Sequence, residues 1–213
     1  AAKGGGLYEA TTTYSQPTYV TLMNVLMYCN EATEEGGAIY TNGNIGIDSV
    51  TGNLNKAPSK GGFIYSAKNA VVWMARDTIT NNQGYMGAGI YANSEFHLSS
   101  TSISQNGGCV SLSNPSGEQV IGTYDHSNRS TISGGGIYID SSAKFQVEND
   151  GAQVFINDNT ADYGGGISNN AKDNKSIFYC SFPCGNVAAL NGGNIFNNGR
   201  LAVYNSEMNT GIA

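Results

Sequence analysis

The chain has 213 residues, a formal net charge of −6 and 12% charged residues, roughly half the proportion found in an average soluble domain. Its basic residues are not clustered, which argues against a nucleic-acid partner, because phosphate contacts require Lys and Arg. Apolar residues make up 39% and glycines number 29, so the composition argues against disorder and predicts a packed core with many tight turns.

A short motif recurs along the chain: two small residues, a variable residue, a branched aliphatic residue and, in most copies, an aromatic residue. Its eight copies are Gly4-Gly-Gly-Leu-Tyr8, Gly36-Gly-Ala-Ile-Tyr40, Gly61-Gly-Phe-Ile-Tyr65, Gly87-Ala-Gly-Ile-Tyr91, Gly107-Gly-Cys-Val-Ser111, Gly134-Gly-Gly-Ile-Tyr138, Gly164-Gly-Gly-Ile-Ser168 and Gly192-Gly-Asn-Ile-Phe196. The first glycines lie 20 to 32 residues apart, which is typical of a solenoid with one coil per unit.

A second element, Asn followed after one residue by Ala, Ser or Gly, stands five or six residues before the glycines in six of the eight units. Its asparagines are Asn30, Asn55, Asn82, Asn128, Asn159 and Asn186. Asparagine tolerates a left-handed backbone and its amide bonds to neighbouring backbone groups in turns. We therefore expect these side chains to form an asparagine ladder at one corner of successive coils.

Short alternating runs between the two elements predict strands, since no stretch holds a helical apolar stripe free of glycine. They are Val20-Thr-Leu22, Val71-Val-Trp73, Phe96-His-Leu98, Phe145-Gln-Val147, Val154-Phe-Ile156 and Leu201-Ala-Val203. Three strands and three turns per unit predict one all-β domain over residues 1–213: a right-handed, single-stranded parallel β-helix of about eight coils. At about 4.8 Å per coil the rod would be about 38 Å long.

The alternation of strand side chains predicts where the aromatic residues of the motif lie. If the aliphatic residue points into the coil, the residue after it points out. Six aromatic side chains would then stack as an external stripe, namely Tyr8, Tyr40, Tyr65, Tyr91, Tyr138 and Phe196, with Ser111 and Ser168 interrupting it. Such a stripe is a candidate surface for sugar rings or a protein partner; the alternatives are an aromatic ladder that only stiffens the rod, or an interior stack.

The four cysteines leave the redox compartment open. Cys180 and Cys184 flank Pro183, and we expect a small loop disulfide there, with a metal half-site as the alternative. Cys29 and Cys109 are expected to be small buried residues. The triplets beginning at Asn128 and Asn174 match the acceptor pattern for N-glycosylation, which such an Asn- and Ser-rich chain also produces by chance.

The combination of an aliphatic residue and Asn-x-Ala with a following Gly-Gly-x-Ile resembles the repeat of the polymorphic outer membrane proteins, a family of chlamydial autotransporter adhesins. The clearest copies run from Met27 through Asn30 to Ile39, and from Val154 to Ile167. The resemblance implies a surface-exposed β-helical passenger used for adhesion. This chain departs from the family where Met27, Ile79, Ile103 and Val154 replace its usual Phe, and we expect no C-terminal β-barrel. The resemblance therefore implies the fold more strongly than the adhesive function.

An enzyme of the pectate lyase or glycoside hydrolase kind is the alternative function, because such enzymes also use parallel β-helices. Those enzymes gather carboxylates, whereas the acidic residues here are dispersed, as at Asp48, Asp77, Asp140, Asp158 and Asp162. Asp125-His126 is the one neighbouring acid–histidine pair, in a turn-like stretch. We therefore predict no catalytic residues, no metal site and no cofactor.

Neither end of the chain shows a capping helix or a charged cap, and a free β-helix end invites strand pairing. The start at Ala1-Ala2-Lys3-Gly4 is interpreted as a cut or processed end. Joining Ala213 to a following Ala1 places the next Gly4 25 residues after Gly192 (213 + 4 − 192), within the observed spacing. We expect an extracellular or cell-surface structural module without membrane insertion, either a head-to-tail filament subunit or a segment of a longer rod, whose partners are further copies or surface glycans and proteins.

Overall fold

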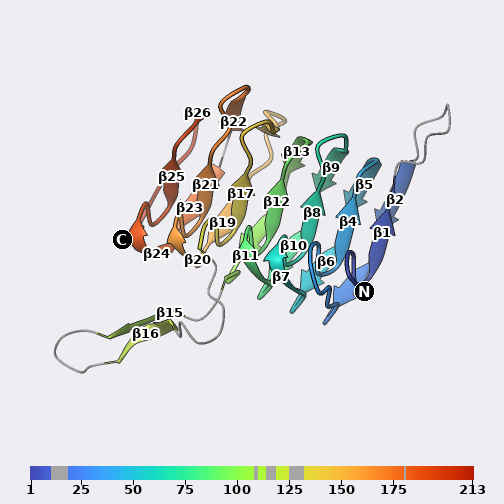
Figure 1. The fold of residues 1–213 in the computed structure, drawn as a ribbon. Coiled ribbons are helices and arrows are strands. Elements are labelled where there is room, and N and C mark those ends of the chain that lie inside the picture. The colour runs from blue at the N-terminus through green and yellow to red at the C-terminus, as the bar shows by residue number, and fades with distance from the viewer. Residues whose placement is uncertain (11–18, 108–109, 114–118, 125–131, 180) are drawn as a thin grey trace.

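The computed structural model describes residues 1–10, 19–107, 110–113, 119–124, 132–179 and 181–213. Within these residues the regular elements are strands, numbered β1 to β26. No helix in the described ranges is long and apolar enough to cross a membrane. The strands stack into an elongated rod with the two chain ends at opposite ends of the stack (Figure 1).

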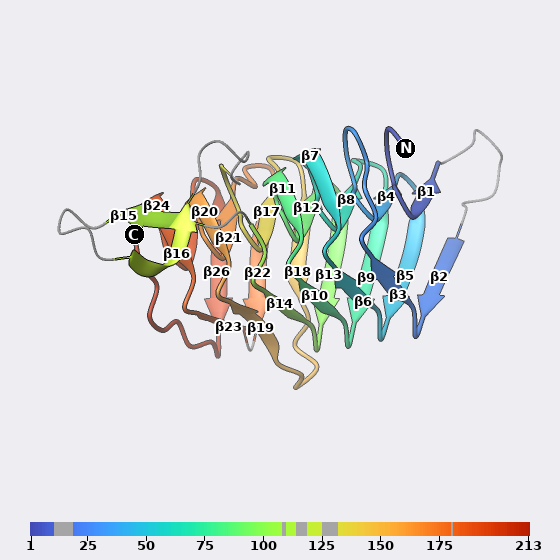
Figure 2. The same cartoon turned by 90° about the horizontal axis from the view of Figure 1, so that it is seen from below.

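Three parallel sheets run along the rod, and each coil except the last contributes one strand to each of them (Figure 2). Sheet 1 consists of β1 (Leu7–Glu9), β4 (Ile39–Thr41), β8 (Ile64–Ser66), β12 (Ile90–Ala92), β17 (Ile137–Ile139), β21 (Ile167–Asn169) and β25 (Ile195–Asn197). Sheet 2 consists of β2 (Tyr19–Met23), β5 (Asn44–Asp48), β9 (Val71–Ala75), β13 (Glu95–Ser99), β18 (Lys144–Val147), β22 (Lys175–Tyr179) and β26 (Arg200–Tyr204).

Sheet 3 contains β3 (Leu26–Tyr28), β6 (Thr51–Asn53), β10 (Thr78–Thr80), β14 (Ser102–Ser104), β19 (Val154–Asn157) and β23 (Ser181–Cys184). Two shorter pairs close the fourth side: β7 (Lys56–Lys60) with β11 (Gln83–Met86), and β20 (Thr160–Tyr163) with β24 (Val187–Asn191). Because every strand of these sheets pairs in parallel with the strand one coil away, the chain is an all-β parallel β-solenoid, as the sequence predicts. The right-handed sense stays a prediction.

The prediction of eight coils is wrong: the solenoid has about six turns, bounded by the seven strands of sheet 1. The unit that begins at Gly107 does not add a coil. In that region β15 (Val110–Ser113) and β16 (Gln119–Tyr124) pair antiparallel with each other, and β12 pairs directly with β17. The motif copy there lies in an insertion between two coils, so Ser111 takes no place in sheet 1.

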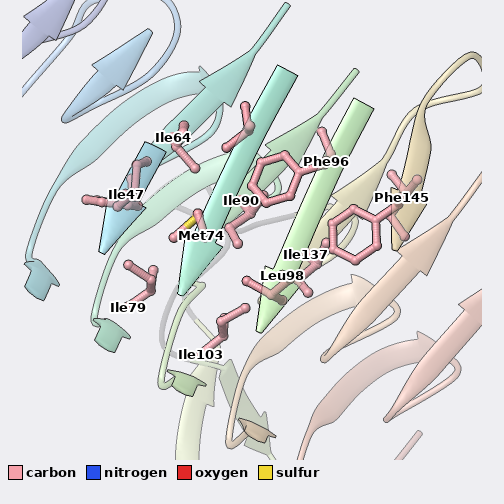
Figure 3. Close-up of a cluster of buried hydrophobic side chains, with 14 of the residues drawn as sticks. Ile47, Ile64, Met74, Ile79, Ile90, Phe96, Leu98, Ile103, Ile137 and Phe145 are labelled. Carbon is pink, nitrogen blue, oxygen red and sulfur yellow. The ribbon is translucent and has the colours of Figure 1, made fainter. Parts of the chain in front are cut away.

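The core is built from columns of like residues from successive coils. The motif isoleucines Ile39, Ile64 and Ile90 are completely buried and lie in register across sheet 1. Opposite them, Phe96 and Phe145 of sheet 2 stack with ring centroids 5.3 Å apart. Figure 3 shows these columns meeting at the centre of the rod. Identical neighbours above and below fill the interior with side chains, and the solenoid is therefore solid.

The paired glycines are needed at the corner that leads into sheet 1. Gly36 has a φ of 65°, and a Cβ there would lie 2.2 Å from the carbonyl oxygen of Ile39. At Gly37 a Cβ would lie 2.1 Å from the carbonyl oxygen of Gly62 on the next coil. The first glycine is thus required by its backbone conformation and the second by the close approach of neighbouring coils.

Candidate functional site

Five tyrosines of the motif form a continuous stack on the outer side of sheet 1, which we call the tyrosine ladder. The members are Tyr8, Tyr40, Tyr65, Tyr91 and Tyr138, with neighbouring ring centroids 5.1, 5.2, 5.1 and 4.9 Å apart. The rings lie nearly parallel, with interplanar angles of 12 to 21°. Their strands are in exact register, so the ring spacing follows directly from the spacing of the coils.

The ladder lies outside the isoleucine core, yet its inner members are not an exposed stripe. Tyr8 at the end is 56% exposed, whereas Tyr91 is only 2% exposed. Each inner ring is covered on both faces by its neighbours, and the ammonium groups of Lys3 and Lys60 lie over Tyr40 and Tyr91, 4.8 and 4.9 Å from the ring centroids. A sugar that stacks on an aromatic face therefore finds no free face along the intact ladder.

The hydroxyl ends of the ladder are bound to side chains of the next coil. Tyr65 hydrogen-bonds to the side chain of Asn93, and the Tyr91 hydroxyl donates to the Asp140 carboxylate. Burial raises the pKa of Tyr65 and Tyr91, and the bond to Asp140 raises the pKa of Tyr91 further. Each partner stands two residues after the motif aromatic of its own coil, so the bonding pattern repeats along the rod.

The ladder breaks at Ser168, which lies in register between Tyr138 and Phe196. Phe196 does not continue the parallel stack: its ring is tilted by 54° against Tyr163, with centroids 5.2 Å apart. A pocket of about 250 Å³ opens at the break. The faces of Tyr138 and Phe196 that a ring at position 168 would cover therefore border an open space.

The asparagine ladder runs along the corner between sheet 3 and the fourth side. The Oδ1 atom of Asn55 accepts from both the backbone N–H and the side-chain amide of Asn30, at 3.0 and 2.9 Å. The same pair of hydrogen bonds, from the backbone N–H and the side-chain amide, runs from Asn55 to Asn82 Oδ1 and from Asn159 to Asn186 Oδ1. Asn55, Asn82, Asn159 and Asn186 are fully buried, so the ladder satisfies backbone groups that water does not reach.

The rung between Asn82 and Asn159 is Asn106, which the sequence reasoning did not select. Asn82 donates to Asn106 Oδ1 at 3.0 and 2.9 Å, and Asn106 donates to Asn159 Oδ1 at 3.0 Å through both groups. The residue selected for this rung, Asn128, lies outside the described residues. The ladder ends at Asn194, whose Oδ1 accepts from Asn186 at 2.9 Å.

The expectation of a buried Cys29 is wrong, because this residue is exposed. It occupies a left-handed turn position with a φ of 53° directly before a ladder asparagine, where the side chain points out of the coil. The Sγ atom of Cys184 lies 3.2 Å from Thr210 Oγ1. Cys180 and Cys109 lie outside the described residues, so the disulfide stays a prediction, as does glycosylation at Asn174, whose amide donates to the Ser142 carbonyl at 3.2 Å.

A polar cluster on the outer face of sheet 2 escaped the sequence reasoning, because its members come from three coils. His97 lies between two carboxylates, with Nδ1 2.5 Å from Glu148 and Nε2 3.2 Å from Glu95. The Lys144 ammonium, hydrogen-bonded to Glu95, lowers the pKa of that carboxyl. Trp73, 43% exposed, stacks against the His97 ring with centroids 5.7 Å apart. The period-two alternation of these strands is the sequence signal from which this cluster could have been predicted.

The remaining acidic residues have separate surroundings. Asp48 pairs with Arg76 on the surface, and Asp77 is buried with an Oδ2 atom that has no hydrogen-bond partner. Burial raises the pKa of Asp77 to about 7, and the neighbouring Asp48 carboxylate contributes. Among the described residues, no three His, Cys, Asp or Glu side chains gather as metal ligands. Asp125 and His126 lie outside the described residues.

Comparisons with protein-family models, curated proteins and solved structures find no match to this chain. The functional argument therefore rests on the geometry of the solenoid itself.

Proposed function

We propose that the chain is a structural β-solenoid module of the extracellular space or cell surface, which elongates by end-to-end stacking of copies and presents its side faces for adhesion. The observation that carries this proposal is the open hydrophobic core at both ends of the rod. The resemblance to the adhesin repeat of the polymorphic outer membrane proteins supports the surface location and the adhesive role.

The first coil leaves its core residues partly uncovered. Leu7, Val20 and Leu22 are only partly buried, although the residues in register one coil further in, Ile39, Ile45 and Ile47, are at most 2% exposed. At the opposite end Ile195, Leu201 and Val203 are likewise partly buried. Burial of such apolar surface stabilises an association by roughly 25 cal/mol per Å², so both end faces favour contact with another coil.

Within the described part of the chain, the strand edges at the two ends also have no partner strand. Among the described strands, β1, β2 and β3 pair only with the coil above them, and β25 and β26 pair only with the coil below. Unpaired edges attract further strands. The occupant that fits best is a second copy of this chain, because both ends carry edge strands of sheets 1 and 2 and an aromatic residue at the ladder position, Tyr8 at one end and Phe196 at the other. Such head-to-tail contact is heterologous and produces filaments.

A charge introduced on the end face tests the stacking. Leu22 of the first coil is partly buried and faces the core, whereas Leu54 of the second coil is 44% exposed. Leu22→Lys should convert filaments into short particles in electron micrographs and light scattering, because the charge would be buried at each junction. Leu54→Lys is the matched control and should leave assembly unchanged. A wild-type chain that stays monomeric at high concentration overturns the proposal.

A second candidate function, glycan binding, is favoured by the cluster around Trp73. An exposed indole beside His97 and Glu95 combines an apolar ring face with hydrogen-bonding groups, the combination that sugar rings require. A glycan array probed with wild type and Trp73→Ala tests this candidate, with Phe155→Ala as the control because Phe155 is exposed on a different sheet. Binding that survives in Trp73→Ala would exclude this face.

A further inference from the structure

A second column of side chains runs beside the tyrosine ladder and covers it, which we call the covering column. It contains the residues that immediately precede each corner glycine, and its pairings place Lys3, Glu35, Lys60, Met86, Ser133 and Tyr163 in register. Three members lie over or against the motif aromatic of the next coil. Lys3 covers Tyr40, Lys60 covers Tyr91, and Tyr163 packs on Phe196.

Two small residues coincide where the ladder breaks. The ladder position is Ser168, and the covering residue one coil earlier is Ser133, whose hydroxyl donates to Ser168 Oγ at 2.7 Å. The bond shows that these two positions lie against each other, as a ring and its cover do elsewhere along the rod. A ring and its covering side chain are thus both missing at one level, which accounts for the pocket of about 250 Å³.

The walls of this pocket are mainly apolar, and three of the seven lining residues are aromatic. They are formed by Met86, Ile132, Ser133, Tyr138, Tyr163, Asn170 and Phe196. The polar atoms nearest the base are already bonded to one another, since Ser168 Oγ also accepts from the Asn170 amide at 3.2 Å. An apolar cavity of roughly 150 Å³ is large enough to bind benzene, so this pocket accommodates one substituted six-membered ring.

The repeat also predicts which residue would contact the outer edge of a ring bound in this pocket. Tyr65 and Tyr91 bond to the residue two positions after the aromatic of the next coil, Asn93 and Asp140. For a ring at the level of Ser168 the corresponding residue is Asn198, which follows Phe196 by two positions. Its side chain lies 3.4 Å from Asn170 Oδ1 and is exposed, so an amide stands where a phenolic hydroxyl would point.

We propose that this pocket is a binding site for one phenolic ring, the size and chemistry of a tyrosine side chain, which completes the tyrosine ladder between Tyr138 and Phe196. Ring faces supply the binding energy by stacking, and the Asn198 side-chain amide forms a hydrogen bond with the phenolic hydroxyl. A pyranose fits less well, because its several hydroxyls would meet the apolar side chains of Met86 and Ile132. The site lies on the side of the rod, and one of its walls, Phe196, belongs to the last coil. All of its walls come from one chain, so binding to the monomer tests the site separately from end-to-end stacking.

Titration with p-cresol, the side-chain analogue of tyrosine, tests the site directly. We expect saturable NMR shifts at millimolar concentration, confined to residues around Ser168. Toluene should bind several-fold more weakly because it lacks the hydroxyl, and methyl glucoside should produce no shifts. If p-cresol produces no saturable shifts, or if methyl glucoside binds and p-cresol does not, the proposal is overturned.

Two variants fill the pocket from different sides. Ser168→Tyr inserts the missing ring, and Ser133→Met inserts the side chain that Met86 supplies one coil earlier; each should weaken p-cresol binding at least about tenfold, or about 1.4 kcal/mol. Ser168→Ala keeps the space open and should retain binding. If p-cresol binds equally to wild type and to both filled variants, as judged in samples whose spectra remain folded, the ligand sits elsewhere and the proposal fails.

Discussion

The two ladders of this solenoid differ in how they tolerate interruption. The asparagine ladder continues through every described coil up to Asn186 and passes the inserted hairpin by using Asn106, whereas the tyrosine ladder stops at Ser168. The asparagines bond to buried backbone groups that have no other partner, and leaving such groups unpaired is costly. The tyrosines lie outside the isoleucine core, where a missing ring removes stacking and a hydroxyl hydrogen bond rather than bonds to buried backbone groups.

The largest expected effect comes from breaking the asparagine ladder in its centre. Asn82→Ala would remove the acceptor of two Asn55 donors and the amide bonded to the Gly52 carbonyl at 3.0 Å. Three buried groups would then lack partners, and we expect the free energy of unfolding to fall by about 5 kcal/mol. Urea denaturation followed by circular dichroism measures this loss.

Asn53→Ala is the matched control, because Asn53 lies one strand away in a half-buried position and accepts only from Asn81 at 3.1 Å. Its replacement should cost no more than about 1 kcal/mol. Equal losses in the two variants would contradict the claim that the buried ladder matters more than surface amide pairs.

Asp77 provides the next largest effect, since it is a buried polar group whose Oδ2 atom lacks a partner. Its pKa rises from 3.8 to about 7 in the folded state, so the folded chain binds a proton that the unfolded chain releases. The stability this group contributes is complete below pH 3.8 and is lost as the pH rises toward 7. The loss amounts to about 4 kcal/mol at 1.36 kcal/mol per pKa unit.

Asp77→Thr isolates this contribution, because Thr101 fills the same column and its hydroxyl accepts from the Asp77 N–H. Stability curves of wild type and variant should diverge between pH 4 and 7, with the variant more stable at the higher pH. The difference between the curves removes the opposite trend from Glu95 and Asp150, whose pKa values are lowered by hydrogen bonds. Parallel curves would mean that Asp77 is not buried.

A smaller effect is expected at the hydroxyl end of the tyrosine ladder. Tyr91→Phe keeps the stacked ring and removes the hydrogen bond to Asp140. We expect a loss of about 1.5 kcal/mol in thermal or urea unfolding, because the acceptor is charged but partly exposed to water. Tyr8→Phe at the exposed end should cost nothing, and a similar loss in both variants would show that ring edges, not Asp140, determine the result.

The repeat predicts most of the fold because each motif residue is determined by its local backbone geometry or by its burial. Gly36 and Gly37 are fixed by backbone geometry, and Ile39 by burial, so the strands of sheet 1 follow from the pattern alone. Asn128 shows the limit: its distance to Gly134 matches the motif, but Asp125 stands three positions before it. Asn30, Asn82, Asn106 and Asn159 are each preceded at that distance by an apolar residue that enters the core, Met27, Ile79, Ile103 and Ile156.

The candidate sites were harder to predict than the coils. The alternation of the strands places Tyr91 outside the isoleucine core, but its burial depends on Lys60, 31 positions earlier in the sequence (91 − 60), and on rings from two other coils. The pocket depends on Ser133 and Ser168, which look unremarkable until their coils are aligned. Variable coil lengths hide this alignment, and the inserted hairpin shifts it further.

Repairing the tyrosine ladder is the smallest of these effects and the one that tests the comparison most directly. Ser168→Tyr places a ring between Tyr138 and Phe196, where the strand register already matches that of the other rungs. Stacked aromatic pairs contribute about 0.5–1.5 kcal/mol each, and the lost bond from Ser133 offsets part of this, so we expect a net gain of about 1 kcal/mol in the free energy of unfolding. Ser168→Ala, which loses the same bond and adds no ring, should be less stable than wild type. A Ser168→Tyr chain less stable than Ser168→Ala would mean that the break does not accept a ring.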